Sequence, residues 1–334
     1  MLRLPSFNFI QPDTLGDVVS VLNAEGPACA VLSGGTDLLP KMKRRQIEPQ
    51  TLVSLDRLAA LRKLEGTGET GVVIGARVTL AELEQNQMLC SQYPAVAAAA
   101  RSISSPPLRN AGTLGGNLCV DTRCTYYDQT HEWRKSIDFC MKKDGHVCWV
   151  APSSPRCWAV ASSDLAPVMI ALNARVRLIS KEGERLIPAA ELYRNDGIEF
   201  LSKRQDELLT EIHLPPARTD LMLYKKLRRR GAIDFPILGV AVRLRPSNTD
   251  AAVIEEGRIA LTAIGSYPFE VEAARAVLAG TRLTDEVIEQ AAEAAWKRAK
   301  PLDNTDLHMS WRKEMVRVYT RRALRELRGV TSVE

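Results

Sequence analysis

The chain has 334 residues, of which 45% are hydrophobic and 25% charged, and its net charge is +5. These values are typical of a globular protein with two or three domains, and the small positive charge does not by itself indicate a nucleic-acid partner. Because no apolar run reaches about 18 residues and no signal peptide is recognisable, we expect no membrane contact and a cytoplasmic location.

The N-terminal part of the chain is predicted to alternate helices and strands. Thr14 can cap the first helix, which Gly26 ends, and Thr79 with Glu82 forms a capping box at the start of a later helix. The segment 106–117 is predicted to be irregular. Helices are expected at 14–25, 37–45, 79–87 and 95–103, and strands at 29–33, 51–55 and 72–74.

The periodicity of helices and strands is lost after position 117 and returns at 164. A structureless span of this length inside a compact domain is usually functional or disordered, and its tryptophans argue against disorder. The pair Pro215-Pro216 predicts a linker, beyond which we expect a separate unit. Helices are expected at 165–172, 271–279, 284–299 and 310–328, and strands at 175–180, 208–214, 221–226, 237–244 and 258–264.

Three glycine motifs differ in what they predict. The run 66–71 matches G-x-G-x-x-G but precedes a strand, so we interpret it as a turn and not as a dinucleotide fingerprint. The segment 31–38, by contrast, follows a strand and opens a helix, where paired glycines let backbone N–H groups bind an anion. An ordinary strand–turn–helix is the alternative. This segment consists of Val31, Leu32, Ser33, Gly34, Gly35, Thr36, Asp37 and Leu38.

A second glycine pair strengthens the hypothesis of a dinucleotide site. It is flanked by polar residues, as the first pair is, and two such loops in one domain could hold the two phosphates of a dinucleotide from both sides. The motif consists of Thr113, Leu114, Gly115, Gly116 and Asn117.

Four of the seven cysteines are clustered in the segment that lacks periodicity: Cys124, Cys140, Cys148 and Cys157. Cytoplasmic thiols stay reduced, so the cluster indicates a metal centre in preference to disulfides. The spacing C-x15-C-x7-C-x8-C matches neither a zinc finger nor a compact ferredoxin motif and identifies no metal. Four thiolates fit a cubane iron–sulfur cluster or a zinc site, and four unrelated buried cysteines are the alternative. Cys119 could compete as a ligand, but it belongs to the second glycine loop.

Taken together, these motifs resemble the FAD-binding subunit of the xanthine dehydrogenase and molybdenum hydroxylase family, nearly from end to end. Segment 33–37 looks like the family's first pyrophosphate loop, and segment 109–117, the most specific match, looks like its second. The resemblance implies that Asp164 contacts the flavin, that Lys226 lies near the flavin ring, and that Ile103 makes an apolar contact with FAD.

The fold class implied by this resemblance is α+β. Two N-terminal α/β subdomains, 1–56 and 57–216, would clamp FAD, and a C-terminal domain, 217–334, would combine an antiparallel sheet with helices. A cysteine-bearing insertion would occupy about 119–160 of the middle subdomain, because the family joins its Gly-Gly-Asn motif to the aspartate by a much shorter loop.

The insertion itself resembles that of the beta subunits of 4-hydroxybenzoyl-CoA reductase, a branch of the family with an additional [4Fe–4S] cluster. On that resemblance, Cys124, Cys140, Cys148 and Cys157 are its ligands. The implied function is electron relay in a molybdenum enzyme that dehydroxylates 4-hydroxybenzoyl-CoA reductively. The implied partners are a molybdopterin-binding large subunit, a small [2Fe–2S] subunit and a ferredoxin-like donor, in a dimer of heterotrimers.

Two alternatives belong to other classes. The first is an FAD subunit of an oxidative molybdenum hydroxylase whose cysteines hold zinc. The second is a non-catalytic scaffold that binds partners and has lost its flavin. The chain contains no nucleophile elbow, zinc-protease or P-loop motif, so we expect no catalytic acid–base residues in it.

Overall fold

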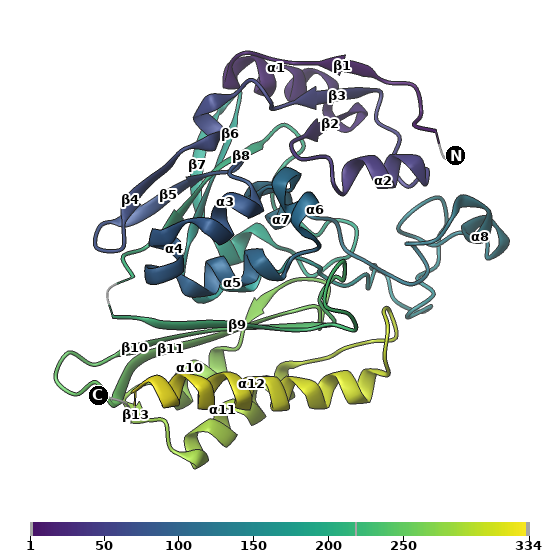
Figure 1. Ribbon diagram of the computed structural model, residues 1–334. Helices are drawn as coiled ribbons and strands as arrows, with labels where there is room; N and C mark the ends of the chain where they lie inside the picture. The colour runs from purple at the N-terminus through teal and green to yellow at the C-terminus, as the bar shows by residue number, and fades with distance from the viewer. Residues whose placement is uncertain (1–2, 218, 332–334) are drawn as a thin grey trace.

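The computed structural model describes residues 3–217 and 219–331 and contains three separate sheets (Figure 1). The expected α+β class is confirmed. Each sheet falls within one of the three expected segments, 1–56, 57–216 and 217–334, while position 218, inside the predicted linker, lies outside the described residues. In the described part of the chain, no helix is long and apolar enough to cross a membrane.

The first sheet is parallel throughout, with the order β1-β3-β2. The side chain of Thr14 caps its first helix by accepting from the N–H of Asp17, as the sequence predicts. The elements are β1 (Asn8–Ile10), α1 (Leu15–Glu25), β2 (Cys29–Leu32), α2 (Leu38–Lys43) and β3 (Thr51–Ser54).

The second sheet is antiparallel, with the order β4-β5-β8-β6-β7, and one face of it is covered by helices. Its strands are β4 (Leu64–Thr67), β5 (Gly71–Gly75), β6 (Arg175–Ser180), β7 (Gly183–Pro188) and β8 (Leu208–Leu214). The helices are α3 (Leu80–Gln85), α4 (Gln87–Gln92), α5 (Pro94–Ser102), α6 (Pro106–Ala111), α7 (Leu114–Leu118) and α9 (Leu165–Ala171).

The third sheet, ordered β12-β11-β10-β9 with β13 beside β11, is antiparallel. Its elements are β9 (Leu221–Leu227), β10 (Leu238–Pro246), β11 (Val253–Thr262), β12 (Phe269–Glu270), α10 (Glu272–Leu278), β13 (Thr281–Arg282), α11 (Asp285–Arg298) and α12 (Met309–Thr331).

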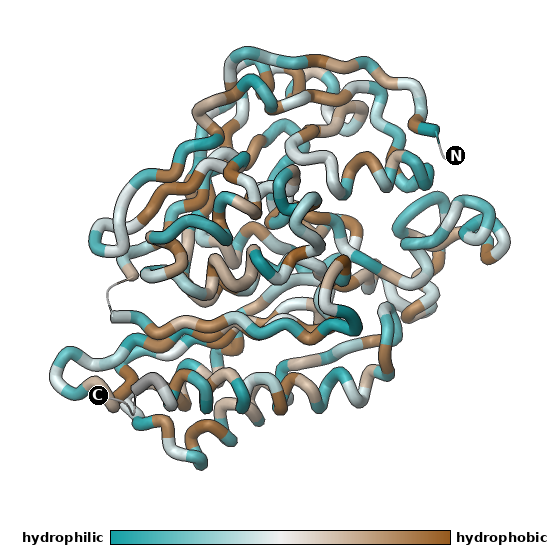
Figure 2. Tube along the Cα trace, viewed as in Figure 1, coloured by the Kyte–Doolittle hydropathy of each residue, from teal (hydrophilic) through white to brown (hydrophobic). Residues whose placement is uncertain are grey.

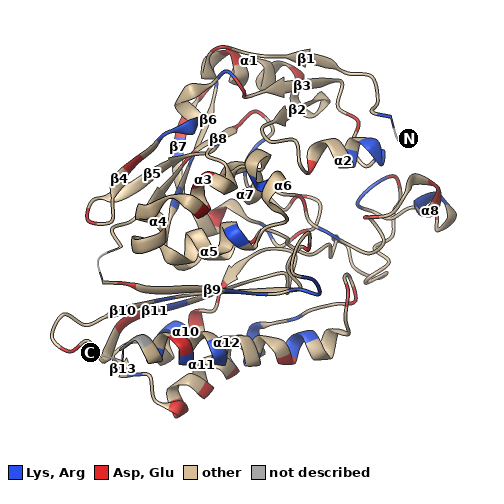
Figure 3. Ribbon diagram, viewed as in Figure 1, with Lys and Arg blue, Asp and Glu red and all other residues tan. Residues whose placement is uncertain are grey.

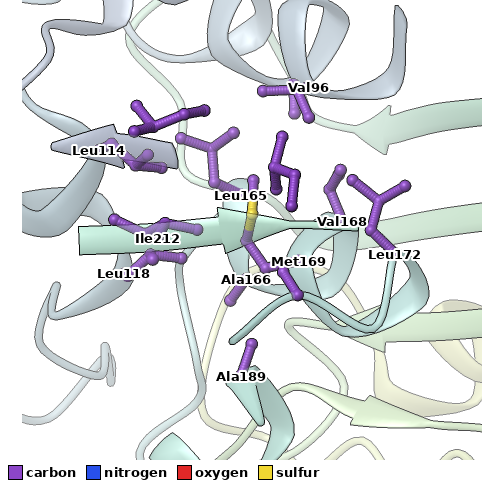
Figure 4. Packing of buried hydrophobic residues seen from close by; sticks show 14 of the residues in the cluster. Val96, Leu114, Leu118, Leu165, Ala166, Val168, Met169, Leu172, Ala189 and Ile212 are labelled. Atoms are coloured by element: carbon purple, nitrogen blue, oxygen red, sulfur yellow. The ribbon is translucent and has the colours of Figure 1, made fainter. Parts of the chain in front are cut away.

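The hydrophobic core explains why the C-terminal unit does not stand apart from the rest. Every residue of α9 is buried, and this helix packs among α5, α7 and the strands β10 and β11 (Figure 4). Tyr224, Ala241 and Ala260 of the third sheet join the same cluster. The opposite face of that sheet packs on α10–α12, so it is sandwiched between two sets of helices.

The inserted segment has one helix, α8 (His131–Ser136), and is otherwise turns and isolated bridges. It extends beside α2 at one side of the molecule and is mostly hydrophilic along its length (Figure 2). The expected loss of regular structure is therefore largely confirmed.

Several local predictions were wrong. Segment 106–117 is not irregular, because Pro106 starts a short helix and Thr113 caps a second one. The helix expected at 79–87 ends at Gln85, where Asn86 becomes the cap of α4. The turn predicted for the glycine-rich run 66–71 is confirmed, because this run connects the paired strands β4 and β5.

Candidate functional site

A cavity of about 370 Å³ lies between the first and second units and is lined by both glycine loops. Its volume falls in the range of small-molecule pockets, about 300–1,000 Å³. Eleven of the predicted cofactor residues line it: Val31, Ser33, Gly34, Gly35, Thr36, Asp37, Leu38, Ile103, Thr113, Gly116 and Asn117. Phe235, from the loop between β9 and β10, also lines it, so the C-terminal unit contributes.

The two glycine loops touch each other directly. The hydroxyl oxygens of Ser33 and Thr113 are 3.0 Å apart. A Cβ added to Gly34 would lie 1.9 Å from the carbonyl oxygen of Ala111, so only glycine permits this approach. Gly35 has a φ of +68°, which favours glycine as well. The loops thus form one continuous wall of a cradle that side chains would fill, which fits a dinucleotide.

Not every residue of the second loop faces the cavity. Leu114 is fully buried in the core, and a Cβ on Gly115 would lie 2.7 Å from the Cβ of Ala76. The N–H of Gly115 donates to the carbonyl oxygen of Ala76 at 2.9 Å. Gly115 therefore permits close packing of α7 on the neighbouring segment. Leu32, the last residue of β2, also does not line the cavity.

Asp164 and Lys226 lie together but do not line the cavity. The ammonium of Lys226 donates to Asp164 Oδ2 at 2.9 Å, and the hydroxyl of Tyr224 donates to Oδ1 at 2.6 Å. Burial raises the pKa of Asp164, and the charge of Lys226 opposes that rise. The pair joins α9 to β9 and thereby fixes the C-terminal sheet beside the second unit; the predicted flavin contacts of both residues stay predictions.

The second candidate site is a pocket formed by all four clustered cysteines. Each is less than 10% exposed, and the four line a shared void of about 10 Å³, together with Tyr127 and Trp149. Such a void holds about one water, so a larger group would have to spread the thiols apart. The pocket, which we call the cysteine pocket, contains no His, Asp or Glu among its described lining residues.

No group of three or more His, Cys, Asp or Glu residues in the described part of the chain is arranged to hold a single metal ion. An iron–sulfur cluster places its four thiolates farther apart than one zinc ion does, because inorganic sulfide and iron lie between them. The donor set of four thiols without nitrogen or oxygen ligands fits such a cluster chemically.

The thiols already influence one another. The pKa of Cys148 is lowered to about 5, chiefly because Cys157 hydrogen-bonds to its sulfur, and the pKa of Cys157 is raised for the same reason. Burial raises the pKa of Cys124 to about 12, and the nearby Cys140 and Cys148 add to the rise. Cys119 lines the cavity between the glycine loops and not the cysteine pocket, and Cys90 is exposed.

Long-range hydrogen bonds place the insertion. Gln46 donates to the carbonyl oxygen of Tyr127 at 2.8 Å, and Arg134, which is 1% exposed, donates to the carbonyl oxygens of Arg44 and Arg45 at 3.0 Å. Asn304 donates to the carbonyl oxygen of Trp158 at 2.6 Å. The insertion is thus fastened to both the first and the third unit.

Sequence reasoning missed several cavity residues. Lys41 and Asp121 carry charge into the cavity, and Phe235 closes it beneath the guanidinium of Arg123, which lies 4.1 Å from the ring centroid. The basic stretch that begins at Lys41 was a signal for an anionic ligand, but nothing local marks Asp121 or Phe235.

Facing glycine loops between two α/β units define a dinucleotide-binding protein. Residues 5–217 match the family described as the FAD binding domain in molybdopterin dehydrogenase, and residues 222–327 match the CO dehydrogenase flavoprotein C-terminal domain. The chain therefore belongs to the FAD-binding subunits of the xanthine dehydrogenase and CO dehydrogenase molybdenum hydroxylase family.

The similarity to characterised relatives spans nearly the whole chain. It is 28% identical to the carbon monoxide dehydrogenase medium chain of Hydrogenophaga pseudoflava, over 96% of both chains. It is 32% identical to the aldehyde oxidoreductase FAD-binding subunit PaoB of Escherichia coli K12, over 75% of this chain and 80% of that one. A crystal structure of Cu,Mo-CO dehydrogenase superposes with a TM-score of 0.80 at 26% identity, covering 98% of this chain and 99% of the other.

Proposed function

We propose that this chain is a combined flavin and iron–sulfur subunit that relays electrons in a molybdenum enzyme. We further propose that the enzyme removes the phenolic hydroxyl of 4-hydroxybenzoyl-CoA reductively, to give benzoyl-CoA, in the cytoplasm. The observation that carries the proposal is the convergence of four buried thiols on one void. The insertion that contains them is fastened beside the cavity between the glycine loops, which we call the flavin cavity.

The residues of the chain have separate tasks in this proposal. The paired glycine loops bind the pyrophosphate of FAD, and Ile103 and Phe235 cover the cavity with apolar surface. The four cysteines hold a [4Fe–4S] cluster, and the aromatic side chains of Tyr127 and Trp149 exclude water from it. When bound, FAD supplies storage of two electrons, and the cluster supplies transfer of one.

An electron relay requires partners that supply the electrons and accept them. We propose a molybdopterin-binding large subunit, a small [2Fe–2S] subunit and a ferredoxin-like donor, assembled as a dimer of heterotrimers. The medium-chain and subunit designations of its relatives support a multi-subunit assembly.

Purification with the partner subunits, followed by analysis of iron, acid-labile sulfide and FAD, tests the proposal. The small subunit contributes the iron and sulfide of its own [2Fe–2S] centres, so we expect four iron and four sulfide more per chain than those centres contain, and an additional EPR signal after reduction with dithionite. Stoichiometric zinc, with no iron or sulfide beyond that of the [2Fe–2S] centres, would reject the cluster.

An oxidative hydroxylase subunit is the second candidate, favoured by the names of relatives such as the nicotine 6-hydroxylase medium subunit of Paenarthrobacter nicotinovorans. In that case reduced viologen would not drive dehydroxylation of 4-hydroxybenzoyl-CoA by the assembled enzyme. A scaffold without flavin, the third possibility, would elute from gel filtration without FAD.

A further inference from the structure

One partly buried carboxylate lies between the two sites. Asp121 lies on the segment that joins the second glycine loop to Cys124, and it lines the flavin cavity. Its Oδ2 accepts a hydrogen bond from the ammonium of Lys41, and its Oδ1 accepts one from the ammonium of Lys142 at 2.7 Å. Asp121 thus binds a lysine of the first unit and a lysine of the insertion with one side chain (Figure 3 shows the charges around α2 and the insertion).

Lys41 belongs to the flavin site. It lies in α2, immediately beyond the first glycine loop, and is 2% exposed. Among the described residues that line the flavin cavity, it is the one cation. The nearest acidic partner of Lys41 is Asp121. The carboxylate of Asp37 is farther away, at 3.9 Å from the Nζ of Lys41.

Lys142 belongs to the cysteine pocket. It follows Cys140 by two residues, its side chain is 6% exposed, and it is the one charged residue among the described residues that line the pocket. Its ammonium also donates to Thr122 Oγ1 at 2.8 Å. The Nζ atoms of Lys142 and Lys41 lie 4.9 Å and 5.0 Å from the ring centroid of Tyr127, so one aromatic ring contacts both cations.

A buried arrangement of this kind is a poor source of net stability. Removing ions from water costs several kcal/mol each, about as much as their mutual attraction returns. Three ionised side chains between two candidate redox sites are better explained by the field they produce. A fixed ammonium stabilises the more negative, reduced state of a nearby group.

We propose that Asp121 is a positioning residue shared by both sites: it holds the charge of Lys41 against the flavin cavity and the charge of Lys142 against the cysteine pocket. The role of Lys142, which we call the Lys142 half, rests on the proposed function because it requires a cluster on the thiols. The role of Lys41, the Lys41 half, requires only FAD. Through one carboxylate, the environments of two electron carriers are linked.

Reduction potentials of the purified complex test the inference, read separately from flavin absorbance and from the EPR signal of the cluster. We expect Lys142→Gln to shift the cluster to a more negative potential and to leave the flavin unchanged. We expect Lys41→Gln to shift the flavin to a more negative potential and to leave the cluster unchanged. Lys142→Arg keeps the charge and should restore the cluster potential, whereas a purely structural role would not predict this rescue.

The role of Asp121 is measured by a double-mutant cycle. In an Asp121→Asn background, Lys142→Gln should shift the cluster potential less than it does in the wild type, and Lys41→Gln should shift the flavin potential less. Lys143→Gln, which removes the neighbouring lysine paired with Asp144, is the matched control and should move neither potential. Equal shifts with and without Asp121 would overturn the inference.

The outcome also separates this inference from the proposed function. A wild-type complex with no iron beyond that of its [2Fe–2S] centres would reject the cluster, and with it the proposed role of Lys142. The flavin potentials of Lys41→Gln and Asp121→Asn would then still decide the Lys41 half. Iron-loaded protein with unchanged potentials in all variants would leave the proposed function standing and reject the inference.

Discussion

The flavin cavity and the cysteine pocket lie close together but are built in different ways. The cavity is formed by loops that directly continue regular elements: β2 leads into the first glycine pair, and Thr113 caps the helix that contains the second. The cysteine pocket is formed by turns with almost no regular structure. Its small hydrophobic cluster contains three of the four cysteines themselves.

The difference shows how each site acquires its rigidity. Backbone hydrogen bonds and close glycine contacts hold the walls of the cavity together. The insertion depends on side chains such as Gln46, Arg134 and Asn304 that fasten it to other units. Under the proposed function, a segment with so little core of its own would gain much of its stability from the cluster that the thiols hold. The two sites should therefore respond differently to substitution.

The largest effect should separate the two sites completely. Cys148→Ser removes one thiolate from the pocket, and we expect it to abolish the iron of the proposed [4Fe–4S] cluster while FAD stays bound. Iron and FAD analysis of the purified protein measures both quantities. Cys90→Ser, at an exposed cysteine outside both sites, is the control and should change neither. Unchanged iron in Cys148→Ser would reject the ligand assignment.

A substitution in the first glycine loop should affect the binding of FAD, where Cys148→Ser affects iron. In Gly34→Ala the new Cβ would overlap the carbonyl oxygen of Ala111, so the two loops must move apart. We expect FAD affinity to fall by at least about tenfold, which corresponds to about 1.4 kcal/mol. Fluorescence titration of the apoprotein with FAD measures it. Gly231→Ala adds a Cβ in open space and should bind FAD normally; equal losses in both variants would contradict this account.

A third substitution tests the buried ion pair that joins α9 to the C-terminal sheet. Asp164→Asn leaves the buried ammonium of Lys226 without its counter-charge, and breaking a buried pair in this way costs about 3 kcal/mol or more. Denaturant unfolding measures the change. The matched control is Lys225→Gln, which breaks a largely exposed pair with Glu326 and should cost less than about 1 kcal/mol. Similar losses in the two variants would show that the buried pair has no special importance.

The last prediction, a partial loss of iron, concerns packing behind the cysteine pocket. A Cβ on Gly197 would lie 2.7 Å from Cys157 Sγ, and crowding of this kind costs about 1–3 kcal/mol. We expect Gly197→Ala to lower iron occupancy partially and to leave FAD content unchanged. Gly16→Ala, with 3.6 Å to its nearest neighbour, is the control. Full iron occupancy in Gly197→Ala would mean that the pocket can relax without cost.

The sequence by itself determined the features that depend on local order along the chain. The two glycine pairs, their place between a strand and a helix or at a capped turn, and the loss of periodicity around the cysteines were all readable from neighbouring residues. These features indicated the family and ten residues of the cavity, and the resemblance to the family added Ile103. They do not show that Gly115 packs against Ala76 while Gly116 lines the cavity, because both glycines have the same local pattern.

Only the tertiary structure decided which distant residues meet. Asp121 and Lys41 are 80 positions apart, Arg134 and Arg44 are 90 apart, and no periodic pattern links either pair. The convergence of the four thiols on one void is of the same kind, since turns of no regular type bring them together. Such contacts depend on how the three sheets and the insertion pack together. The free energy of that packing is a sum over many residues, so no short segment of the sequence predicts it.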